Sequence, residues 1–278
     1  MDIAIVGMGL IGGSFAKAIK KYTNHKIYGL DINQKSIEQA KADAVIDEQT
    51  NESQLNKMDL VIVCLHPRNA INFILNNISN FKKDSIVADS CGIKGAIVDA
   101  CDRKLYDNNI NFIGAHPMAG RERFGYDASL SDLYLNASMI FTLTQNTNQK
   151  AVDIFEKLCL QIGFSRVVKT NPKHHDEVIA YTSQLAHVVS NAYVKSPTLF
   201  NRNGYSAGSF LDLTRVARLD ENMWTQLFLY NRDELVHQID IILENIKKCR
   251  DAIFENDESG LREILKQGRI LKEKSLEE

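Results

Sequence analysis

The first 170 residues of the chain alternate short apolar runs with amphipathic segments. Several runs are apolar almost throughout, which is typical of strands that are covered on both faces. The segments between them repeat apolar residues at helical spacing. The predicted strands are 3–6, 27–30, 60–65, 85–88, 112–115, 139–143 and 165–169. This alternation predicts an α/β fold with a doubly wound, mainly parallel sheet.

From Asn171 onward the pattern is helical for most of the remaining length, and Pro172 fits the first turn of a helix. The tail 257–278 alternates charges around a few leucines and isoleucines, as a terminal helix with a solvated face does. We therefore predict a sheet domain over residues 1–170 and a helical domain over residues 171–278.

One long apolar seam runs along the helical part. Its residues recur in steps of four and three and are Leu235, Ile239, Ile242, Ile246, Cys249 and Ile253. Such a seam packs against other helices. They belong either to a partner subunit, which predicts a homodimer through the C-terminal helices, or to a bundle within the chain.

Composition narrows the class of function. The 278 residues are 44% hydrophobic, and 33 basic against 35 acidic residues leave a net charge of -2. Such a small net charge does not favour electrostatic binding to nucleic acid or to a membrane surface, so we expect chemistry on small molecules. The five cysteines are scattered without CxxC spacing, which favours reduced thiols over disulfides or a zinc site. With neither a charged leader nor a membrane-spanning run, we expect a cytoplasmic protein without a metal.

A glycine-rich turn follows the first strand and precedes a helical pattern. Gly7 permits a tight turn, Gly9 permits close approach of a ligand, and Gly12 lets the helix pack against its strand. The helix would present its N-terminal amides to a pyrophosphate. Asp31, at the end of the second strand, is placed to bind the hydroxyls of an adenosine ribose. This context favours a Rossmann-type dinucleotide site over a merely structural turn.

Other candidate residues lie at the same edge, because the carboxyl ends of parallel strands meet there. The segments are 66–67, 89–92 and 116–120. We expect the cofactor to contact the glycine turn, Asp31 and the neighbouring strand ends, through Gly7, Gly9, Leu10, Ile11, Gly12, Asp31, Leu65, Pro67 and Gly92.

His116 is the first candidate for chemistry. An imidazole titrates near neutrality and can take a proton from a hydroxyl while hydride leaves the same carbon. A lone histidine is also commonly structural. A second group is Ser183, Gln184 and His187, whose spacing places them toward one side of a helix. Either a ligand or a hydrogen-bonded helix contact would explain this group.

The third candidate is the stretch 208–218, where Asp212, Arg215 and Arg218 are three residues apart. A surface ion pair is the simplest interpretation of this spacing. However, Arg215 lies among apolar residues, so we expect a partly buried guanidinium. Its planar fork matches a carboxylate with two parallel hydrogen bonds, which predicts an anionic substrate.

Four motifs together closely resemble the prephenate dehydrogenase family, with its arogenate-using relatives. They are Gly-x-Gly-Leu-Ile-Gly-Gly-Ser at 7–14, Gly-Ala-His-Pro-Met-Ala-Gly at 114–120, Thr-Ser-Gln-Leu-Ala-His at 182–187 and Ser-Phe-x-Asp-x-Thr-Arg-Val-Ala at 209–217. The resemblance implies an NAD-binding domain joined to a helical dimerisation domain, with the active site in the cleft between them. The implied reaction is oxidative decarboxylation of prephenate to 4-hydroxyphenylpyruvate in tyrosine biosynthesis.

The resemblance also implies roles for single residues. His116 would accept the proton of the ring hydroxyl, Arg215 would bind a substrate carboxylate, and His187 would lie on the substrate-binding helix with Ser183 and Gln184. Matching positions around the site entrance are Glu122, Asp212 and Trp224.

Two positions depart from the family pattern. Many members have Gly-Ser-Val-Lys where this chain has Cys91-Gly92-Ile93-Lys94, so Ser90 or a water would replace the family serine. The family motif Ser-His-Leu-Pro-His also becomes Ser-Gln-Leu-Ala-His, with Gln184 in place of a histidine.

Asp31 favours NAD, because a carboxylate repels the 2′-phosphate of NADP and no arginine follows it directly. Alternatives to prephenate oxidation are an arogenate dehydrogenase, a two-domain dehydrogenase of the β-hydroxyacid or pyrroline-carboxylate reductase type, and a non-catalytic NAD-binding regulator.

Overall fold

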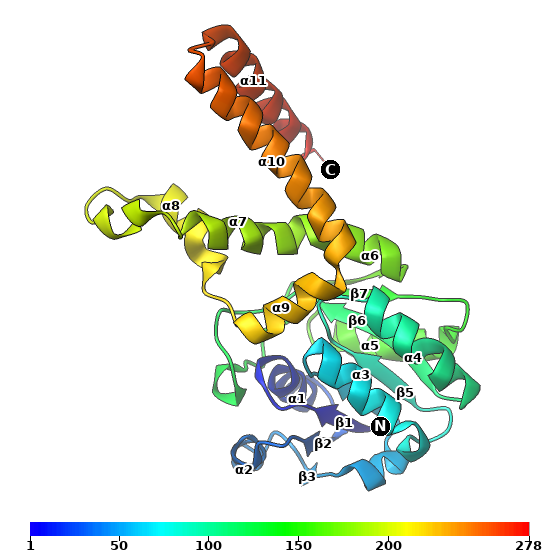
Figure 1. Ribbon diagram of the computed structural model, residues 1–278. Coiled ribbons are helices and arrows are strands. Elements are labelled where there is room, and N and C mark those ends of the chain that lie inside the picture. The colour runs from blue at the N-terminus through cyan, green and yellow to red at the C-terminus, as the bar shows by residue number, and fades with distance from the viewer. Residues whose placement is uncertain (278) are drawn as a thin grey trace. The chain divides into compact units, whose positions relative to one another are not determined.

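A computed structural model describes residues 1–277 and contains an eight-stranded sheet with the order β3-β2-β1-β4-β5-β6-β7-β8 (Figure 1). Strands β1 to β6 are parallel, β7 runs antiparallel to β6, and β8 is parallel to β7. The bounds are β1 Asp2–Val6, β2 Lys26–Leu30, β3 Glu48–Gln49, β4 Leu60–Val63, β5 Ile86–Asp89, β6 Asn111–Pro117, β7 Ser138–Thr142 and β8 Arg166–Thr170. The predicted doubly wound, mainly parallel sheet is confirmed.

All seven predicted strands are present, and their bounds differ from the predicted ones by no more than two residues. The prediction missed β3, which has only two residues and pairs with Tyr28 and Gly29 of β2. Two exposed polar residues carry no apolar run, so the pattern of hydrophobic positions could not reveal this edge strand.

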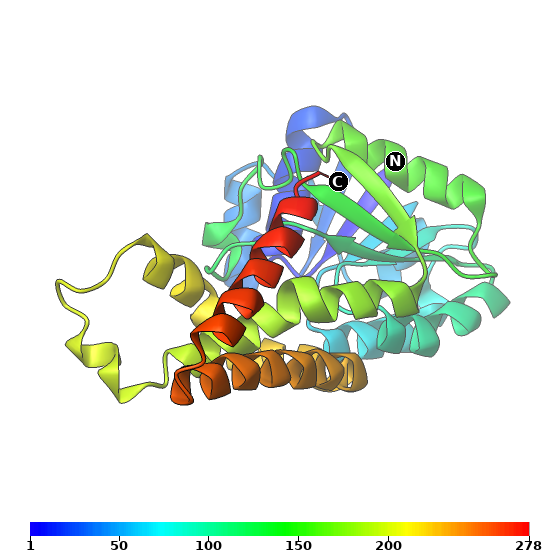
Figure 2. The same ribbon diagram turned by 90° about the horizontal axis from the view of Figure 1, so that it is seen from above.

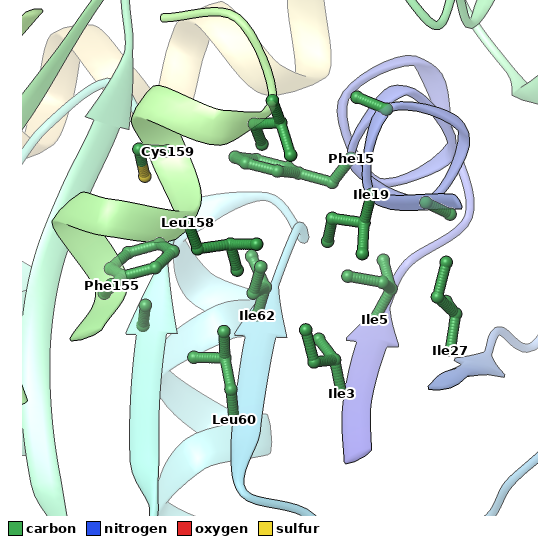
Figure 3. Close-up of a cluster of buried hydrophobic side chains, with 14 of the residues drawn as sticks. Ile3, Ile5, Phe15, Ile19, Ile27, Leu60, Ile62, Phe155, Leu158 and Cys159 are labelled. Atoms are coloured by element: carbon green, nitrogen blue, oxygen red, sulfur yellow. The ribbon is translucent and has the colours of Figure 1, made fainter. Parts of the chain in front are cut away.

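Helices cover both faces of the sheet. On one face lie α1 (Leu10–Tyr22), α2 (Gln34–Ala42) and α5 (Gln149–Gln161), and on the other α3 (Pro67–Asn76) and α4 (Gly95–Asp107). Successive side chains of a strand point to opposite faces. In β1, Ile3 and Ile5 therefore enter the first core, where Phe15 of α1 and Phe155 of α5 close over the sheet (Figure 3). Ala4 and Val6 enter the second core.

Close backbone packing fixes the turn between β1 and α1. Gly7 has a φ of +90°, a conformation that favours glycine. A Cβ added at Gly12 would collide with the Gly7 carbonyl oxygen. The turn therefore needs glycine at both positions to bring the start of α1 against the end of β1.

Residues 171–231 are helical for most of their length, as predicted. They form α6 (Pro172–Ile179), a π-helical turn (Ala180–Gln184), α7 (Leu185–Tyr193), α8 (Gly208–Thr214) and α9 (Glu221–Tyr230). Asn171 caps α6 by accepting a hydrogen bond from the His174 amide. The segment that carries α8, yellow in Figures 1 and 2, extends away from the sheet. Short 3₁₀ helices occupy Glu52–Lys57, Ile78–Asn80, Tyr126–Ala128, Pro197–Asn201 and Arg215–Ala217.

By their internal contacts, residues 1–231 and 232–278 form two compact units. The second contains α10 (Arg232–Phe254) and α11 (Glu258–Lys274), which pack against each other (Figure 1). The predicted seam thus lies on one continuous helix, α10, and the predicted tail helix is α11. The domain boundary at 170/171 remains a prediction.

Within the part of the chain that the structure describes, every helix is too short or too polar to cross a membrane.

Candidate functional site

His116 lies near the end of β6, where it pairs with Ile140 of β7. Its ring is half-buried, and one edge faces the loop that follows β5. A Cβ added at Gly92 would lie 3.7 Å from Nε2 of His116, and 3.5 Å from a methyl group of Leu227 on α9. Gly92 is therefore an immediate neighbour of the imidazole at the carboxyl edge of the sheet.

The other ring nitrogen of His116 contacts a second histidine. Nδ1 of His116 lies 2.9 Å from Nε2 of His175, and Nδ1 of His175 lies 2.6 Å from Oδ1 of Asp176. Both residues of the second pair are buried in the first turns of α6. The structure therefore joins β6 to α6 through a row of three polar side chains.

Burial sets the protonation of both rings. It lowers the pKa of His116 well below 6.5, and the nearby His175 and Lys94 lower it further. Burial also lowers the pKa of His175, although Asp176 opposes that shift. Both imidazoles are thus neutral at pH 7, and a neutral imidazole can accept a proton.

A buried ion pair supports the loop between β5 and α4. The side chains of Lys94 and Asp89 are both 0% exposed and pair through Nζ and Oδ2. Nζ of Lys94 also donates to the Ala115 carbonyl at 2.7 Å, and Asp89 accepts from the backbone amides of Cys91 and Ala115 at 2.9 and 3.2 Å. The pair thus ties the loop to the residue that precedes His116.

The glycine turn and its surroundings fit a dinucleotide. A Cβ added at Gly9 would meet nothing within 4 Å, so the backbone is open to a ligand there. Gly9 is the N-cap of α1 and supplies no side chain to the helix amides, which leaves them available to a phosphate. Asp31 accepts from the amides of Met8 and Asn33 at 2.6 and 2.7 Å, which holds its carboxylate beside the turn.

The remaining predicted cofactor residues lie around this turn. Leu10 and Ile11 begin α1, and Pro67 is the first residue of α3. A Cβ added at Gly7 would lie 2.9 Å from Leu65, so Leu65 packs against the turn. Their contacts with NAD stay predictions.

A second group of predicted residues meets on α7 and α9. The rings of His187 and Trp224 have centroids 3.6 Å apart, and Nδ1 of His187 donates to the Val216 carbonyl at 3.0 Å. Because Nδ1 carries this proton, Nε2 is the free acceptor of the neutral ring. Burial lowers the pKa of His187.

Gln184 also faces α9, but its amide is engaged. Its Nε2 donates to the Leu227 carbonyl at 3.1 Å and its Oε1 accepts from Asn231 at 2.8 Å. The side chain is 1% exposed and joins the two helices, and its contact with the substrate stays a prediction. Ser183, in the same π-helical turn, is half-buried.

Arg215 departs from its predicted burial. Its side chain is 66% exposed, so the expectation of a partly buried guanidinium is wrong. Its apolar neighbours in sequence lie on a segment that extends away from the sheet. They therefore do not bury the guanidinium. Arg215 instead pairs with Glu122, which is far away in sequence, and Asp212 is exposed on α8.

Ser90 does not point to His116. Its hydroxyl donates to the Val63 carbonyl at 3.3 Å, at the end of β4. The contacts of Ser90 therefore do not support the expectation that it takes the place of a serine at position 92, because its hydroxyl is held at the end of β4.

The sequence pattern did not lead us to His175 and Asp176. The available signal was a His-Asp pair one turn into a helix, with Ile179 four residues after His175 on the same face. An apolar residue at that spacing marks the buried face, and a buried histidine requires a partner.

Both parts of the chain match models of one protein family. Residues 15–168 match the family described as prephenate dehydrogenase, nucleotide-binding domain, and residues 171–267 match prephenate dehydrogenase, dimerization domain. The cyclohexadienyl dehydrogenase of Zymomonas mobilis is 33% identical, over 96% of this chain and 93% of its own length. The prephenate dehydrogenase of Bacillus subtilis is 30% identical, over 96% and 74%.

Among solved structures, prephenate dehydrogenase from Aquifex aeolicus in complex with hydroxyphenyl propionate and NAD⁺ superposes with a TM-score of 0.88. It is 30% identical, and the match covers 99% of this chain and 98% of that chain.

Proposed function

The chain belongs to the prephenate dehydrogenase family of NAD-dependent oxidoreductases, and from this premise we propose that it converts prephenate to 4-hydroxyphenylpyruvate in tyrosine biosynthesis. The observation that carries the proposal is the position of Nε2 of His116, the ring nitrogen that does not contact His175. It lies beside Gly92, at the edge of the sheet where the glycine turn and Asp31 fit the cofactor.

The substrate is a cyclohexadiene with a ring hydroxyl opposite a carbon that bears a carboxylate and a pyruvyl group. Nε2 of His116 accepts the hydroxyl proton, since burial keeps the pKa of this ring low and the ring neutral. Bound NAD supplies the hydride acceptor. Loss of the ring carboxylate then gives an aromatic phenol, so the protein mainly has to orient one hydroxyl and two anionic groups.

Arg215 is the proposed anchor for a substrate carboxylate. In the structure it is paired with Glu122, and a substrate carboxylate would take over this guanidinium. We expect Arg215→Ala to raise KM about 10- to 100-fold with a smaller effect on kcat, because a hydrogen bond to a charged group contributes about 1.5–3 kcal/mol. Steady-state kinetics with varied substrate at saturating NAD measure both.

The exposed neighbour Arg218 is the control for lost surface charge, and Arg218→Ala should keep the KM of the unmodified protein. Glu122→Gln removes the competing carboxylate and should leave KM unchanged or lower it. An unchanged KM in Arg215→Ala would return Arg215 to the role of a surface ion pair.

Asp31 predicts a preference for NAD. Its carboxylate would repel a 2′-phosphate, so we expect activity with NADP to be lower by about tenfold or more. The next residue, Ile32, is fully exposed and offers a place for a cation. The double variant Asp31→Asn/Ile32→Arg should therefore shift the ratio of kcat/KM values toward NADP. Equal use of both cofactors by the unmodified protein would refute the role of Asp31.

We also propose that the chain works as a homodimer through its C-terminal helices. Within 232–278, Ile246 and Ile253 of the predicted seam are 54% and 62% exposed in the single chain. Apolar side chains left exposed along a helix are typical of a surface that a second subunit covers. Sedimentation analysis should give twice the chain mass of 31.4 kDa.

We also propose a cytoplasmic location. The free cysteines at 64, 91, 101, 159 and 249 support it, because reduced thiols are typical of that compartment.

An assay with NAD and either prephenate or arogenate, followed at the absorbance of NADH, tests the proposed function. We expect reduction with prephenate. The name of the Zymomonas relative, cyclohexadienyl dehydrogenase, supports arogenate as the second candidate. Failure to reduce NAD with either substrate would contradict the proposal and favour a non-catalytic role.

A further inference from the structure

The row His116–His175–Asp176 has a defined direction. Oδ1 of Asp176 accepts from the Lys94 amide and Oδ2 from the Gly95 amide, both at 2.8 Å. A carboxylate that holds two backbone N–H groups in this way acts as an acceptor. The proton in its bond with His175 therefore belongs to Nδ1 of His175.

The direction carries through to the next ring. The neutral His175 has its proton on Nδ1, so its Nε2 is an acceptor. Nδ1 of His116, 2.9 Å away, must then be the donor in their shared bond. This leaves the lone pair of His116 on Nε2, the atom that faces residue 92.

The far end of the row is firmly held. The side chain of His175 is 0% exposed and that of Asp176 is 9% exposed. Asp176 also binds through its main chain, because its carbonyl accepts from Asn231 at 2.9 Å. Since Lys94 and Gly95 form the start of α4, Asp176 joins the first turns of α4 and α6.

We propose that His175 and Asp176 are positioning residues that fix the ring orientation and the tautomer of His116, so that Nε2 is its free basic atom. The inference rests on the proposed function for its consequence in turnover. The inference itself concerns only which ring nitrogen of His116 carries the proton. A competing possibility is that the pair merely packs α6 against α4.

Two substitutions at one position separate these possibilities. A glutamine can place its amide oxygen near the position of the histidine Nε2, and so can still accept from His116. An asparagine reaches only the position of Nδ1, so it can keep the bond to Asp176 but loses His116. We expect His175→Asn to lower kcat about 10- to 10³-fold, short of the full contribution of a general base. His175→Gln should lose less, and KM for NAD should stay unchanged in both.

Asp176→Asn tests the other end of the row. An amide nitrogen in place of Oδ1 would donate to Nδ1 of His175 and reverse the row, which moves the His116 proton to Nε2, but it would also face the Lys94 N–H. An amide nitrogen in place of Oδ2 would keep the row and lose only the bond from Gly95. In the triad of serine proteases, the corresponding Asp→Asn change keeps the geometry and lowers kcat about 10⁴-fold through the wrong tautomer. We expect Asp176→Asn to lower kcat as well, but by less, because the amide can keep its oxygen toward His175 and the Lys94 amide and give up only the bond from Gly95.

The pH dependence gives a readout that packing alone would not move. The groups that face the two rings are Lys94, Asp89 and Asp176, and each ring faces the other. Removing His175 removes one of the causes that lower the pKa of His116. The acid limb of kcat/KM should therefore move to higher pH in His175→Gln, whereas a packing defect would lower the whole profile without moving it.

The adjacent His174 provides a matched control, because its side chain is 64% exposed and lies outside the row. His174→Gln should behave like the unmodified protein. If His175→Asn and His175→Gln both keep the kcat and the pH profile of the unmodified protein, the inference is wrong.

Ring ¹⁵N chemical shifts test the tautomer without turnover. The unmodified protein should show His116 protonated at Nδ1, and His175→Asn should lose this preference. A His116 protonated at Nε2 in the unmodified protein would overturn the inference. If the unmodified protein reduces NAD with neither substrate, the proposed function fails, and these shifts still decide the positions of the protons.

Discussion

Replacing His116 with asparagine will lower kcat about 10²- to 10⁴-fold, which is the usual contribution of a general base. Asparagine keeps a polar side chain near the end of β6 but cannot take up a proton at neutral pH. The glycine turn and Asp31 are untouched by this change. The affinity for NAD, measured by calorimetry, should therefore equal that of the unmodified protein.

The pH profile offers a second check on the same residue. Only the neutral ring can accept the hydroxyl proton, and burial holds the pKa of His116 well below 6.5. Activity that depends on this ring is thus present at pH 7 and is lost as the pH falls through the lowered pKa. The acid limb of kcat/KM should lie below pH 6.5, and His116→Asn should abolish it. Normal turnover by His116→Asn would remove this residue from the mechanism.

The glycine turn and the strand pattern could be predicted because both are local. The turn between β1 and α1 needs Gly7 and Gly12 for contacts within a few residues, and the apolar strand runs reflect burial on both faces. Since the carboxyl ends of parallel strands share one edge, the place of His116 followed directly from the end of its strand.

The partners of His116 could not be predicted in the same way. His175 and Lys94 lie 59 and 22 positions away in sequence and reach the site from α6 and from the loop before α4. Their roles depend on which helix start meets which strand end. Sequence spacing within one helix says nothing about this.

The exposure of Arg215 could not be predicted from its local sequence either. Its apolar neighbours in sequence suggested burial, but they lie in a segment that extends away from the sheet, and its ionic partner Glu122 comes from the loop after β6. Local apolar composition indicates burial only where another element covers the segment.

Replacing Lys94 with methionine will lower the free energy of unfolding by about 3–5 kcal/mol, because it leaves Asp89 as an unpaired charge in the interior. Both side chains are 0% exposed, so water cannot take the place of the lost ammonium group. A domain of ordinary stability has about 5–15 kcal/mol in total, and we expect the midpoint of thermal unfolding to fall by roughly 10 °C. Chemical denaturation with urea measures the free energy directly.

A double-mutant cycle shows whether this loss belongs to the pair. Asp89→Asn alone should also destabilise the fold, whereas Asp89→Asn/Lys94→Met should cost less than the sum of the single changes, because no buried charge is left unpaired. Lys82→Met is the control. Lys82 pairs with Asp59 at 2.6 Å with 47% and 38% of the side chains exposed, and such a solvent-screened pair contributes little to stability. Additive losses at Asp89 and Lys94 would mean that the two side chains act separately. A coupled loss would show that the two charges act as one ion pair, which holds the backbone of the residue before His116.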